Sequence, residues 1–574
     1  MTANVTRSGW RERLIVLAIL LVSLAARSRD LAAPFDREFE GAQGAFFAIG
    51  AVNYERLGLW RSGGYPVVNI DLGPVGGPTR AGSDLRDLRA PRDTRDLRDE
   101  PSTWYLYANH PPLVPLLAWS ALRVGDPEGL DRSAKDHAAP ANIEPWIRAP
   151  FLAAGILALF ALWWAIREAA GPRRAALALG VASLLPISVI YGTLVNYENP
   201  ALVCILFAVG YFARWMRDQG ARSLAGVALW MAAGSVVTYS ALFFLPALAL
   251  VVAVHLGWKR ALWFSLASGS VGLVPIVAHG AWSAIVHARL GLVARTMPDR
   301  ARELLSPLLD GSESLGHWAL LQFTRVGQWF TVPVALCAAL GAVLWLAHGL
   351  RGRFGPKPPA QDPEKALNLE PALLAGAALF LLANFRHTLD PQHTFLILLI
   401  PAVAGFAALA LDHVASALAR RGMGALPIAL LVSALAMQGL QRANDLRFDF
   451  RSSANESQAE RAPPLLPLPN ITGAEFASLV APGDFGIHPA CMGLNNPAVS
   501  FYAWRSLWAV KDPEDTQPWA VARFIGLGGR RHVLLLPKHP WPAIAEAVGK
   551  LERTWAKDIA PDRESENWRA WDLH

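Results

Sequence analysis

Residues 148–178 read RAPFLAAGILALFALWWAIREAAGPRRAALA, an apolar run followed by a short basic loop and the start of a second apolar run. The first run is close to the ~20 residues that an α-helix needs to cross the hydrocarbon core of a bilayer. The arginines after it are typical of a cytoplasmic loop, because positive charge is retained on that side of the membrane. The stretch therefore predicts two membrane-spanning helices joined inside the cell.

The composition of the whole chain agrees with this interpretation. Its 574 residues are 53% hydrophobic and 17% charged, whereas a soluble protein carries about a quarter charged residues. The net charge of +7 comes from Lys and Arg in short loops between apolar runs, so we expect no nucleic-acid partner. Cys204, Cys337 and Cys491 are too far apart to form a disulfide framework or a zinc motif.

Apolar runs alternate with basic loops from the N-terminus to about residue 440. Residues 14–26 follow a basic N-terminus but lack a signal-peptide cleavage site, so we expect a retained first span. Placing every basic loop in the cytoplasm gives one path with eleven spans and a C-terminal region outside. The other ten expected spans are 150–166, 175–192, 200–214, 223–238, 241–257, 261–279, 328–349, 370–385, 394–411 and 424–440.

The first outer loop covers about residues 30–148 and contains a further apolar segment, Pro111–Val124. This segment is short for a span, and a crossing there would reverse the side of every later basic loop. We therefore expect an interfacial helix on the outer face, with Pro111 and Pro112 in its first turn, where no backbone donor is needed. Residues 71–101 alternate in charge, which predicts a solvated, flexible insert without chemistry.

The composition becomes more polar after about residue 445. RHVLLLP (531–537) is typical of a strand and WPAIAEAVGKLERTW (541–555) of an amphipathic helix. We expect a transmembrane domain at 1–444 and a small soluble α/β domain at 445–574 on the outer side. The fold class is thus mainly α, a polytopic helical membrane protein with a small C-terminal α/β domain.

Acids on the outer face, a group of three within five residues and one isolated glutamate, are the candidates for catalysis. Asp36, Glu38 and Glu40 directly follow the first span. Glu198 lies in the second outer turn, YGTLVNYENP (191–200), between Tyr197 and Asn199. Such acids are costly to bury beside apolar spans and are often functional, although each could also be a solvated interfacial acid.

Basic side chains also gather on the outer face, against the usual charge bias, and predict a phosphate site. Any one of them could instead contact lipid headgroups or form a salt bridge. The candidates are His110, Arg148, Arg325, Arg386, His387 and His393.

The sequence contains no P-loop, dinucleotide-binding, HExxH, GxSxG or DxD motif, so a nucleotide-consuming cytoplasmic site has no support. The acids after the first span, NHPPL (109–113) and the stretch 148–178 together resemble the GT-C membrane glycosyltransferases. HTFLILLIPAVAGFAALAL (393–411) and VSFYAWRS (499–506) add to the likeness. The resemblance is to the bacterial relatives of the protein O-mannosyltransferases and to the lipid A aminoarabinose transferases, of glycosyltransferase family 39 type.

The resemblance implies an inverting transfer from a polyprenyl-phosphate sugar donor to a glycan, lipid or protein acceptor at the outer face of the cytoplasmic membrane. It implies a general base among Asp36, Glu38 and Glu40, with Glu198 as an orienting acid and Tyr197 and Asn199 beside the substrate. Oligosaccharyltransferases hold a metal with an acidic pair in the second outer turn. Glu198 stands alone there, which leaves a divalent cation open and assigns no cofactor.

Two other classes of protein remain as alternatives. A polytopic transporter or lipid flippase would place ionisable residues within spans and would show two repeated halves. Here the charges lie chiefly at span ends, and no internal repeat is evident. A non-catalytic assembly or sensor protein would have its outer acids and bases dispersed over the fold.

Overall fold

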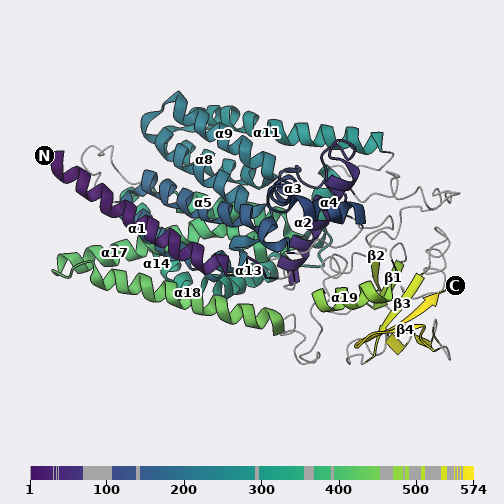
Figure 1. Ribbon diagram of the computed structural model, residues 1–574. Helices are drawn as coiled ribbons and strands as arrows, with labels where there is room; N and C mark the ends of the chain where they lie inside the picture. The colour runs from purple at the N-terminus through teal and green to yellow at the C-terminus, as the bar shows by residue number, and fades with distance from the viewer. Residues whose placement is uncertain are drawn as a thin grey trace. The chain divides into compact units, whose positions relative to one another are not determined.

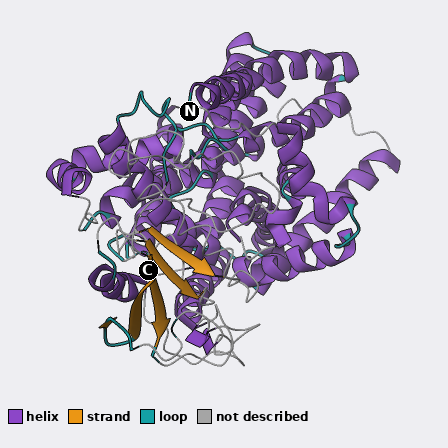
Figure 2. Cartoon of the chain, turned by 90° about the vertical axis from the view of Figure 1, so that its right-hand side faces the viewer, coloured by secondary structure: helices purple, strands orange, loops and turns teal. Residues whose placement is uncertain are grey.

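The computed structural model describes residues 2–29, 31–33, 35, 38–68, 106–136, 142–290, 297–354, 367–389, 393–452, 469–481, 485–489, 506–510, 532–538, 548–549, 552–553, 556 and 560–573. These residues are mainly helical and their strands form a single sheet (Figures 1 and 2), which confirms the expected fold class. The chain divides into two compact units. The first comprises Met1–Leu31, Phe151–Ser283 and Ala294–Arg447, and the second Ala32–Pro150, Ala284–Val293 and Phe448–His574.

Three helices of the first unit (α5, α11 and α18) extend past its boundary. The helices of this unit are α1 (Thr2–Ser28), α5 (Glu144–Ala170), α6 (Pro172–Ser183), α7 (Pro186–Ile190), η4 (Tyr191–Thr193), α8 (Glu198–Asp218), α9 (Ala221–Val237), η5 (Tyr239–Phe243), α10 (Phe244–Leu256), α11 (Trp258–Arg289), α12 (Met297–Leu309), α13 (Leu315–Phe330), α14 (Val332–Phe354), α15 (Glu370–Ala383), α16 (Phe385–Leu389), η6 (His393–Leu399), α17 (Ile400–Arg420) and α18 (Leu426–Ser452).

Each of the eleven predicted spans falls on helical residues. By length and composition, six described helices could each cross a membrane: α5, α8, η5 with α10, α11, η6 with α17, and α18. Two bent pairs raise this number to eight, α6 with α7–η4 at 68° and α13 with α14 at 116°. The remaining three predicted spans fall on α9 and α15, which are shorter, and on α1, which is apolar only over 14–26. The count of eleven therefore stays a prediction.

Helix α17 lies at the centre of the first unit. In its apolar window 89% of the residues are buried, compared with 28% in α11 and 22% in α18. Large apolar side chains such as Leu266, Val274 and Leu430 are instead exposed on these two peripheral helices. Because lipid tails are as apolar as leucine, this pattern is typical of helices that face a bilayer.

The segment between the spans expected at 261–279 and 328–349 contains α12 and most of α13. Helix α13 ends at a 116° bend, where Thr331 has φ 65°, a left-handed conformation that a β-branched residue rarely adopts. The span predicted at 328–349 therefore begins only at Val332. One signal for this bend was present but unused, because Pro333 in the first turn of α14 is typical of a helix start.

The first outer loop forms helices α2 (Glu38–Leu57), α3 (Leu113–Gly125) and α4 (Pro127–Asp136) of the second unit. Helix α3 has 13 residues, as expected of a helix too short to span. Pro112 occupies its N-cap, one residue before the helix, and not the first turn as predicted. Glu55 of α2 joins the two helices, because its carboxylate accepts hydrogen bonds from Trp119 and Arg123 of α3.

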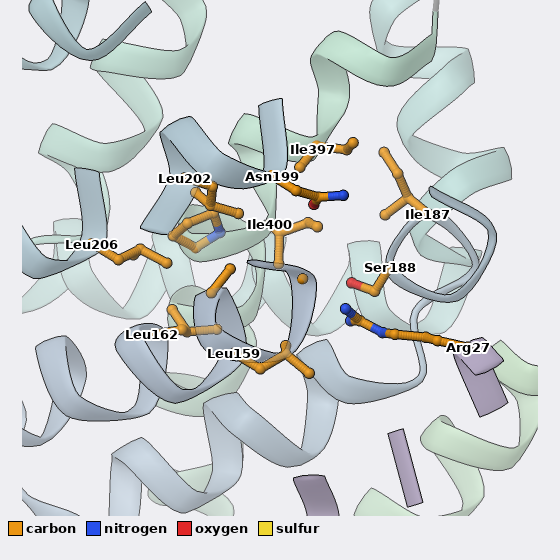
Figure 3. A pocket seen from close by; sticks show the side chains of 13 residues that line it. Arg27, Leu159, Leu162, Ile187, Ser188, Asn199, Leu202, Leu206, Ile397 and Ile400 are labelled. Carbon is orange, nitrogen blue, oxygen red and sulfur yellow. The ribbon is translucent and has the colours of Figure 1, made fainter. Parts of the chain in front are cut away.

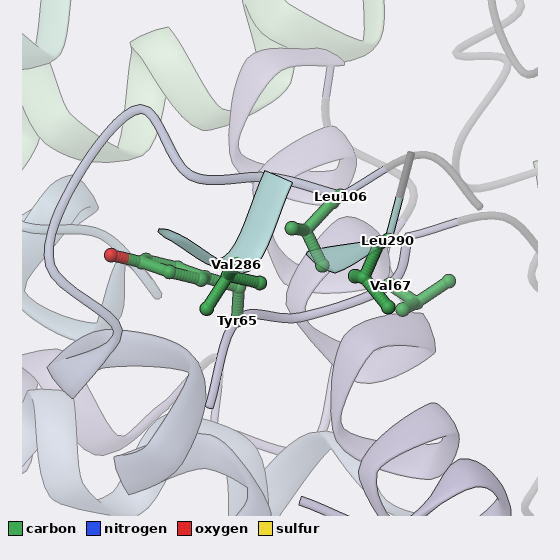
Figure 4. Packing of buried hydrophobic residues seen from close by; sticks show 5 residues of the cluster. All are labelled: Tyr65, Val67, Leu106, Val286 and Leu290. Carbon is green, nitrogen blue, oxygen red and sulfur yellow. The ribbon is translucent and has the colours of Figure 1, made fainter. Parts of the chain in front are cut away.

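A small apolar core stabilises the chain that leaves α2. Its five members are all buried and come from three separate segments (Figure 4): Tyr65, Val67, Leu106, Val286 and Leu290. Tyr54 of α2 supports the same chain, since its hydroxyl donates to the carbonyl of Gly64 at 2.6 Å. Burial raises the pKa of Tyr54, so this hydroxyl keeps its proton and acts as a structural donor.

The C-terminal region forms a five-stranded mixed sheet in the order β2-β1-β3-β5-β4, and helix α19 (Pro469–Leu479) packs on it through Phe476 and Trp568. The predicted strand 531–537 corresponds to β3. The insert 71–101, and most of the helix predicted at 541–555, lie outside the described residues. The domain boundary at 444/445 and the outer location of this region stay predictions. The strands are β1 (Phe485–Pro489), β2 (Ser506–Val510), β3 (His532–Pro537), β4 (Arg563–Glu564) and β5 (Trp568–Leu573).

Replacing Gly341 with alanine is expected to lower the melting temperature of the purified protein. Helix α14 crosses α17 so closely at Gly341 that an added Cβ would lie 1.9 Å from the carbonyl oxygen of Phe406. Such overpacking costs about 1–3 kcal/mol. Thermal unfolding in detergent, followed by tryptophan fluorescence, measures the change.

The matched control is Gly280→Ala in α11, where an added Cβ would meet no atom within 4 Å. This substitution is expected to leave the melting temperature unchanged or to raise it, because alanine favours a helix over glycine by about 1 kcal/mol. Equal shifts in both variants would contradict the close crossing of α14 and α17.

Candidate functional site

The second outer turn places a buried carboxylate at the start of α8. The turn separates η4 from α8, and Glu198 is the first residue of that helix. Its side chain is only 5% exposed, and its Oε2 has no hydrogen-bond partner among the described residues. A helix N-terminus favours negative charge, which stabilises an acid at this position. Glu198 is thus not a solvated turn acid.

The residues around Glu198 hold the turn in place. Asn199 donates from Nδ2 to the carbonyl of Tyr191 at 2.7 Å, and the backbone N–H of Tyr197 donates to Asn196 Oδ1 at 2.7 Å. Trp329 of α13 packs on the ring of Tyr191, with 5.0 Å between ring centroids. Tyr197 and Asn199, predicted beside the substrate, are both buried and help to form the turn.

A buried arginine that the sequence analysis did not single out lines a cavity below this turn. Arg27 is in the last turn of α1, is 2% exposed, and shares the cavity with Ser188 of α7 and Asn199 of α8 (Figure 3). One signal in the sequence could have identified it. An arginine at the outer end of the first span breaks the usual preference of positive charge for the inside.

In the second unit, Phe35 fixes the chain just before the predicted acids Asp36, Glu38 and Glu40. The guanidinium of Arg148 stacks over the buried Phe35 ring, 5.0 Å from its centroid, and donates from Nη1 to the carbonyl of Ala33. On α2, an added Cβ at Gly44 would lie 2.4 Å from the same ring. Arg148, predicted to bind phosphate, therefore supports the backbone just before Asp36.

The predicted acids themselves are only partly described. Asp36 lies outside the described residues. Glu38 and Glu40 are in the first turn of α2, where the backbone but not the side chains is described. Their roles stay predictions.

The NHPPL segment lies against the helix that carries two of these acids. The half-buried ring of His110 is 6.2 Å from that of Tyr107, and Tyr107 in turn contacts Phe46 of α2 at 4.9 Å. Within the second unit, the rings of Tyr107 and Phe46 thus connect His110 to α2.

The remaining predicted basic residues lie on α13, α16 and η6 of the first unit. Arg325 is 6% exposed and donates to the carbonyls of Thr388 and Leu389. Arg386 is half exposed, with its Nη1 3.7 Å from the Glu303 carboxylate. His387 is half-buried on α16, and His393 begins η6, where its side chain is not described. Their binding of a phosphate stays a prediction.

The side chains that are described include no group of three or more His, Cys, Asp or Glu placed to hold a metal ion. Asp36 and the side chains of Glu38 and Glu40 fall outside that set. A divalent cation therefore stays an open alternative.

The comparisons with known proteins agree with the predicted fold. Residues 142–282 match the model of the dolichyl-phosphate-mannose-protein mannosyltransferase family. ArnT from Cupriavidus metallidurans bound to undecaprenyl phosphate has a similar structure, with a TM-score of 0.53 at 14% identity over 99% of this chain and 98% of that chain. Its apo form gives a TM-score of 0.50 at 15% identity with the same coverage. Among curated proteins none matches the chain.

The oligosaccharyltransferase of Archaeoglobus fulgidus matches less well, with a TM-score of 0.46 at 14% identity over 91% of this chain and 68% of that chain. That likeness is too weak to support an argument. The family match is confined to residues 142–282 and agrees with the predicted resemblance to GT-C membrane glycosyltransferases, and the ArnT likeness shows that the fold is shared.

Replacing Arg148 with glutamine is expected to raise amide hydrogen exchange in a peptide covering residues 31–45. The variant loses the hydrogen bond to Ala33 and the stacking on Phe35, and a hydrogen bond from a charged group contributes about 1.5–3 kcal/mol. Exchange there should accelerate about tenfold or more, as measured by mass spectrometry. Arg123→Gln is the control, since this half-exposed arginine of α3 pairs with Glu55 and does not touch residues 33–35. Unchanged exchange in the Arg148 variant would rule out the support of this loop.

Proposed function

We propose that this GT-C glycosyltransferase transfers a sugar from a polyprenyl-phosphate donor to an acceptor at the outer face of the cytoplasmic membrane. The observation that carries the proposal is the buried carboxylate of Glu198, whose Oε2 has no hydrogen-bond partner among the described residues, at the start of a helix long and apolar enough to cross a membrane. It is supported by a fold shared along nearly the full chain with ArnT, whose structure holds undecaprenyl phosphate. An intramembrane acid without a partner marks a functional site by default.

The chemistry assigns the general base to the acids after α1. A carboxylate of Asp36, Glu38 or Glu40 takes the proton from the acceptor hydroxyl or amine as its oxygen or nitrogen attacks the anomeric carbon of the donor. The bond from that carbon to the phosphate oxygen breaks, and the lipid phosphate leaves with the electron pair. A direct displacement of this kind inverts the anomeric centre.

Glu198 serves as the orienting acid in this proposal. Its Oε2 is buried and free to accept a hydrogen bond from a sugar hydroxyl. Tyr197 and Asn199 flank it, and the hydrogen bond from Asn199 to Tyr191 fixes the start of α8. A rigid acid at this point can hold the donor sugar in one orientation.

The basic residues on the outer side stabilise the departing phosphate. Arg386 suits this role because it is half exposed and its pairing with Glu303 is loose, at 3.7 Å. Arg325 donates to two backbone carbonyls instead. His110, Arg148, His387 and His393 complete the predicted set.

Among Asp36→Asn, Glu38→Gln and Glu40→Gln, one variant is expected to lose transfer by about 10²–10⁴-fold, since this is the usual contribution of a general base. The assay follows sugar release from a polyprenyl-phosphate donor by the purified protein. The control is Glu303→Gln, an outer acid that pairs with Arg386 and lies far along the chain from the acidic loop. Full activity in all three variants would show that none of these three residues is the general base.

Glu198→Gln is expected to reduce transfer by about tenfold or more without lowering the melting temperature. The amide has the same shape as the carboxylate and removes a buried charge whose Oε2 has no hydrogen-bond partner among the described residues, so the packing around it is kept. Activity and thermal unfolding are measured on the same preparation. A loss of activity that follows a loss of stability would reduce Glu198 to a structural residue.

A further inference from the structure

Two histidine rings meet between α14 and α17, away from the residues that the proposed transfer uses. The rings of His348 on α14 and His413 on α17 have centroids 5.1 Å apart and an interplanar angle of 68°. His348 is exposed and His413 is half-buried, so solvent reaches the pair. Two imidazoles this close form a cluster of potential metal ligands that the proposed function leaves unexplained.

The packing of the two helices places these rings together. Helix α14 crosses α17 so tightly at Gly341 that an added Cβ would collide with the carbonyl of Phe406. His348 comes seven residues after Gly341, and His413 comes seven residues after Phe406. Seven residues make about two helical turns, so each histidine returns to the side of its helix that faces the other. The backbone therefore fixes the pair, and both helices carry it in the same direction away from the crossing.

The hydrogen bonds of the two rings leave the same nitrogen open on each. Nδ1 of His348 lies 2.7 Å from the carbonyl oxygen of Leu344, and Nδ1 of His413 lies 3.1 Å from that of Leu409. A carbonyl oxygen can only accept, so each Nδ1 carries the proton and donates it. In the neutral ring Nε2 then holds the lone pair, and neither Nε2 has a hydrogen-bond partner among the described residues. A backbone carbonyl that accepts from Nδ1–H also fixes the tautomer of histidines that bind metal through Nε2.

We infer that His348 and His413 bind one transition-metal cation of the class that prefers imidazole, such as Zn²⁺ or Cu²⁺, through their Nε2 atoms. Two imidazoles on one tetrahedral ion, at metal–nitrogen distances of about 2.0–2.1 Å, have ring centroids about 5 Å apart. The observed separation of 5.1 Å matches this geometry. Water completes the coordination, because the described side chains offer no group of three ligands. The inference goes beyond the proposed function and does not depend on it.

An ion pair beside His413 keeps the neighbouring charges from opposing a bound cation. Asp412 Oδ1 lies 3.0 Å from Nε of Arg173 at the start of α6. The carboxylate offsets the positive charge of the guanidinium, which would otherwise repel a metal ion at the next residue. Because this carboxylate is already paired, Asp412 is not counted among the ligands.

A cation held by both rings would link α14 to α17 two turns beyond their tight crossing. A ligand that binds the folded protein and not the unfolded chain stabilises the folded state in proportion to its occupancy of the site. Zn²⁺ is therefore expected to raise the melting temperature of the metal-free protein by a few degrees. His348→Ala should lose this rise and keep the metal-free melting temperature, since the ring is exposed.

The decisive experiment measures the reactivity of each histidine separately. The full-length, tag-free protein is freed of metal with a chelator, titrated with Zn²⁺ and treated with diethyl pyrocarbonate, and the modified histidines are quantified by peptide mass spectrometry. Zn²⁺ is expected to slow modification of His348 and His413 by about fivefold or more at one shared concentration, because a metal-bound nitrogen has no free lone pair. The exposed His255 at the end of α10 is the internal control and should stay reactive.

Reciprocal variants test whether the two rings share one ion. In His348→Ala the zinc concentration that protects His413 should rise about tenfold or more, because a single imidazole lacks the second ligand already in place. His413→Ala should have the same effect on His348. The matched control, His255→Ala, should leave the protection of both rings as in the wild type.

Each result decides for or against the shared site. Zn²⁺ that protects neither His348 nor His413 in the wild type overturns the inference, whatever the variants do. Protection of His413 that persists unchanged in His348→Ala also overturns it, since the two rings then bind metal independently. Sugar transfer plays no part in either measurement, so the proposed function stands or falls separately.

Discussion

The bilayer allows no unpaired backbone group in its core, and this constraint shapes the whole first unit. In a continuous helix the backbone groups pair with one another. A broken helix leaves backbone carbonyls without a partner, and a side chain must donate a hydrogen bond to them. The chain meets this need at two breaks. Asn199 donates to the carbonyl of Tyr191, and Arg325 donates to those of Thr388 and Leu389.

These repaired breaks are where the polar residues of the candidate site gather. Glu198 starts the helix that follows the first break, and Arg386 lies on the short helix α16 at the second. Neither could project from the middle of a regular span without facing lipid or displacing core residues. A broken helix instead gives a buried end, where a charged group finds helix dipoles and backbone donors already oriented. The breaks in the helices thus lie where the polar residues of the candidate site are found.

The sequence was sufficient to predict the fold class, because hydropathy and loop charge show which segments face lipid and which face water. It placed all eleven expected spans on helical residues and located Glu198 in a turn between two of them. It missed the bend at Thr331, although Pro333 stands in the first turn of the helix that follows and is a helix-start signal. The short outer helix at Pro111–Val124 was predicted and corresponds to α3, whereas α4 and α12 were not predicted.

The site was harder to predict, because the sequence does not show which face of a helix meets which neighbour. Arg148 was read as a ligand from its outer position, but its main contact is the Phe35 ring, 113 positions earlier in the numbering. Arg27 was overlooked because its environment is made by Gly155 and Gly192, whose importance appears only when three helices are brought together. Only the packing distinguishes such an arginine from a headgroup contact.

The hydrogen bonds around Thr388 have a mechanical consequence. Trp318, Gln322 and Arg325 all donate to this one residue, so α13 and α16 are joined along two turns of α13. At its far end α13 presses Trp329 onto Tyr191, the residue whose carbonyl Asn199 holds. Helix α13 therefore contacts α16 through Thr388 at one end and the turn before Glu198 through Trp329 at the other, so the two breaks in the helices share one support.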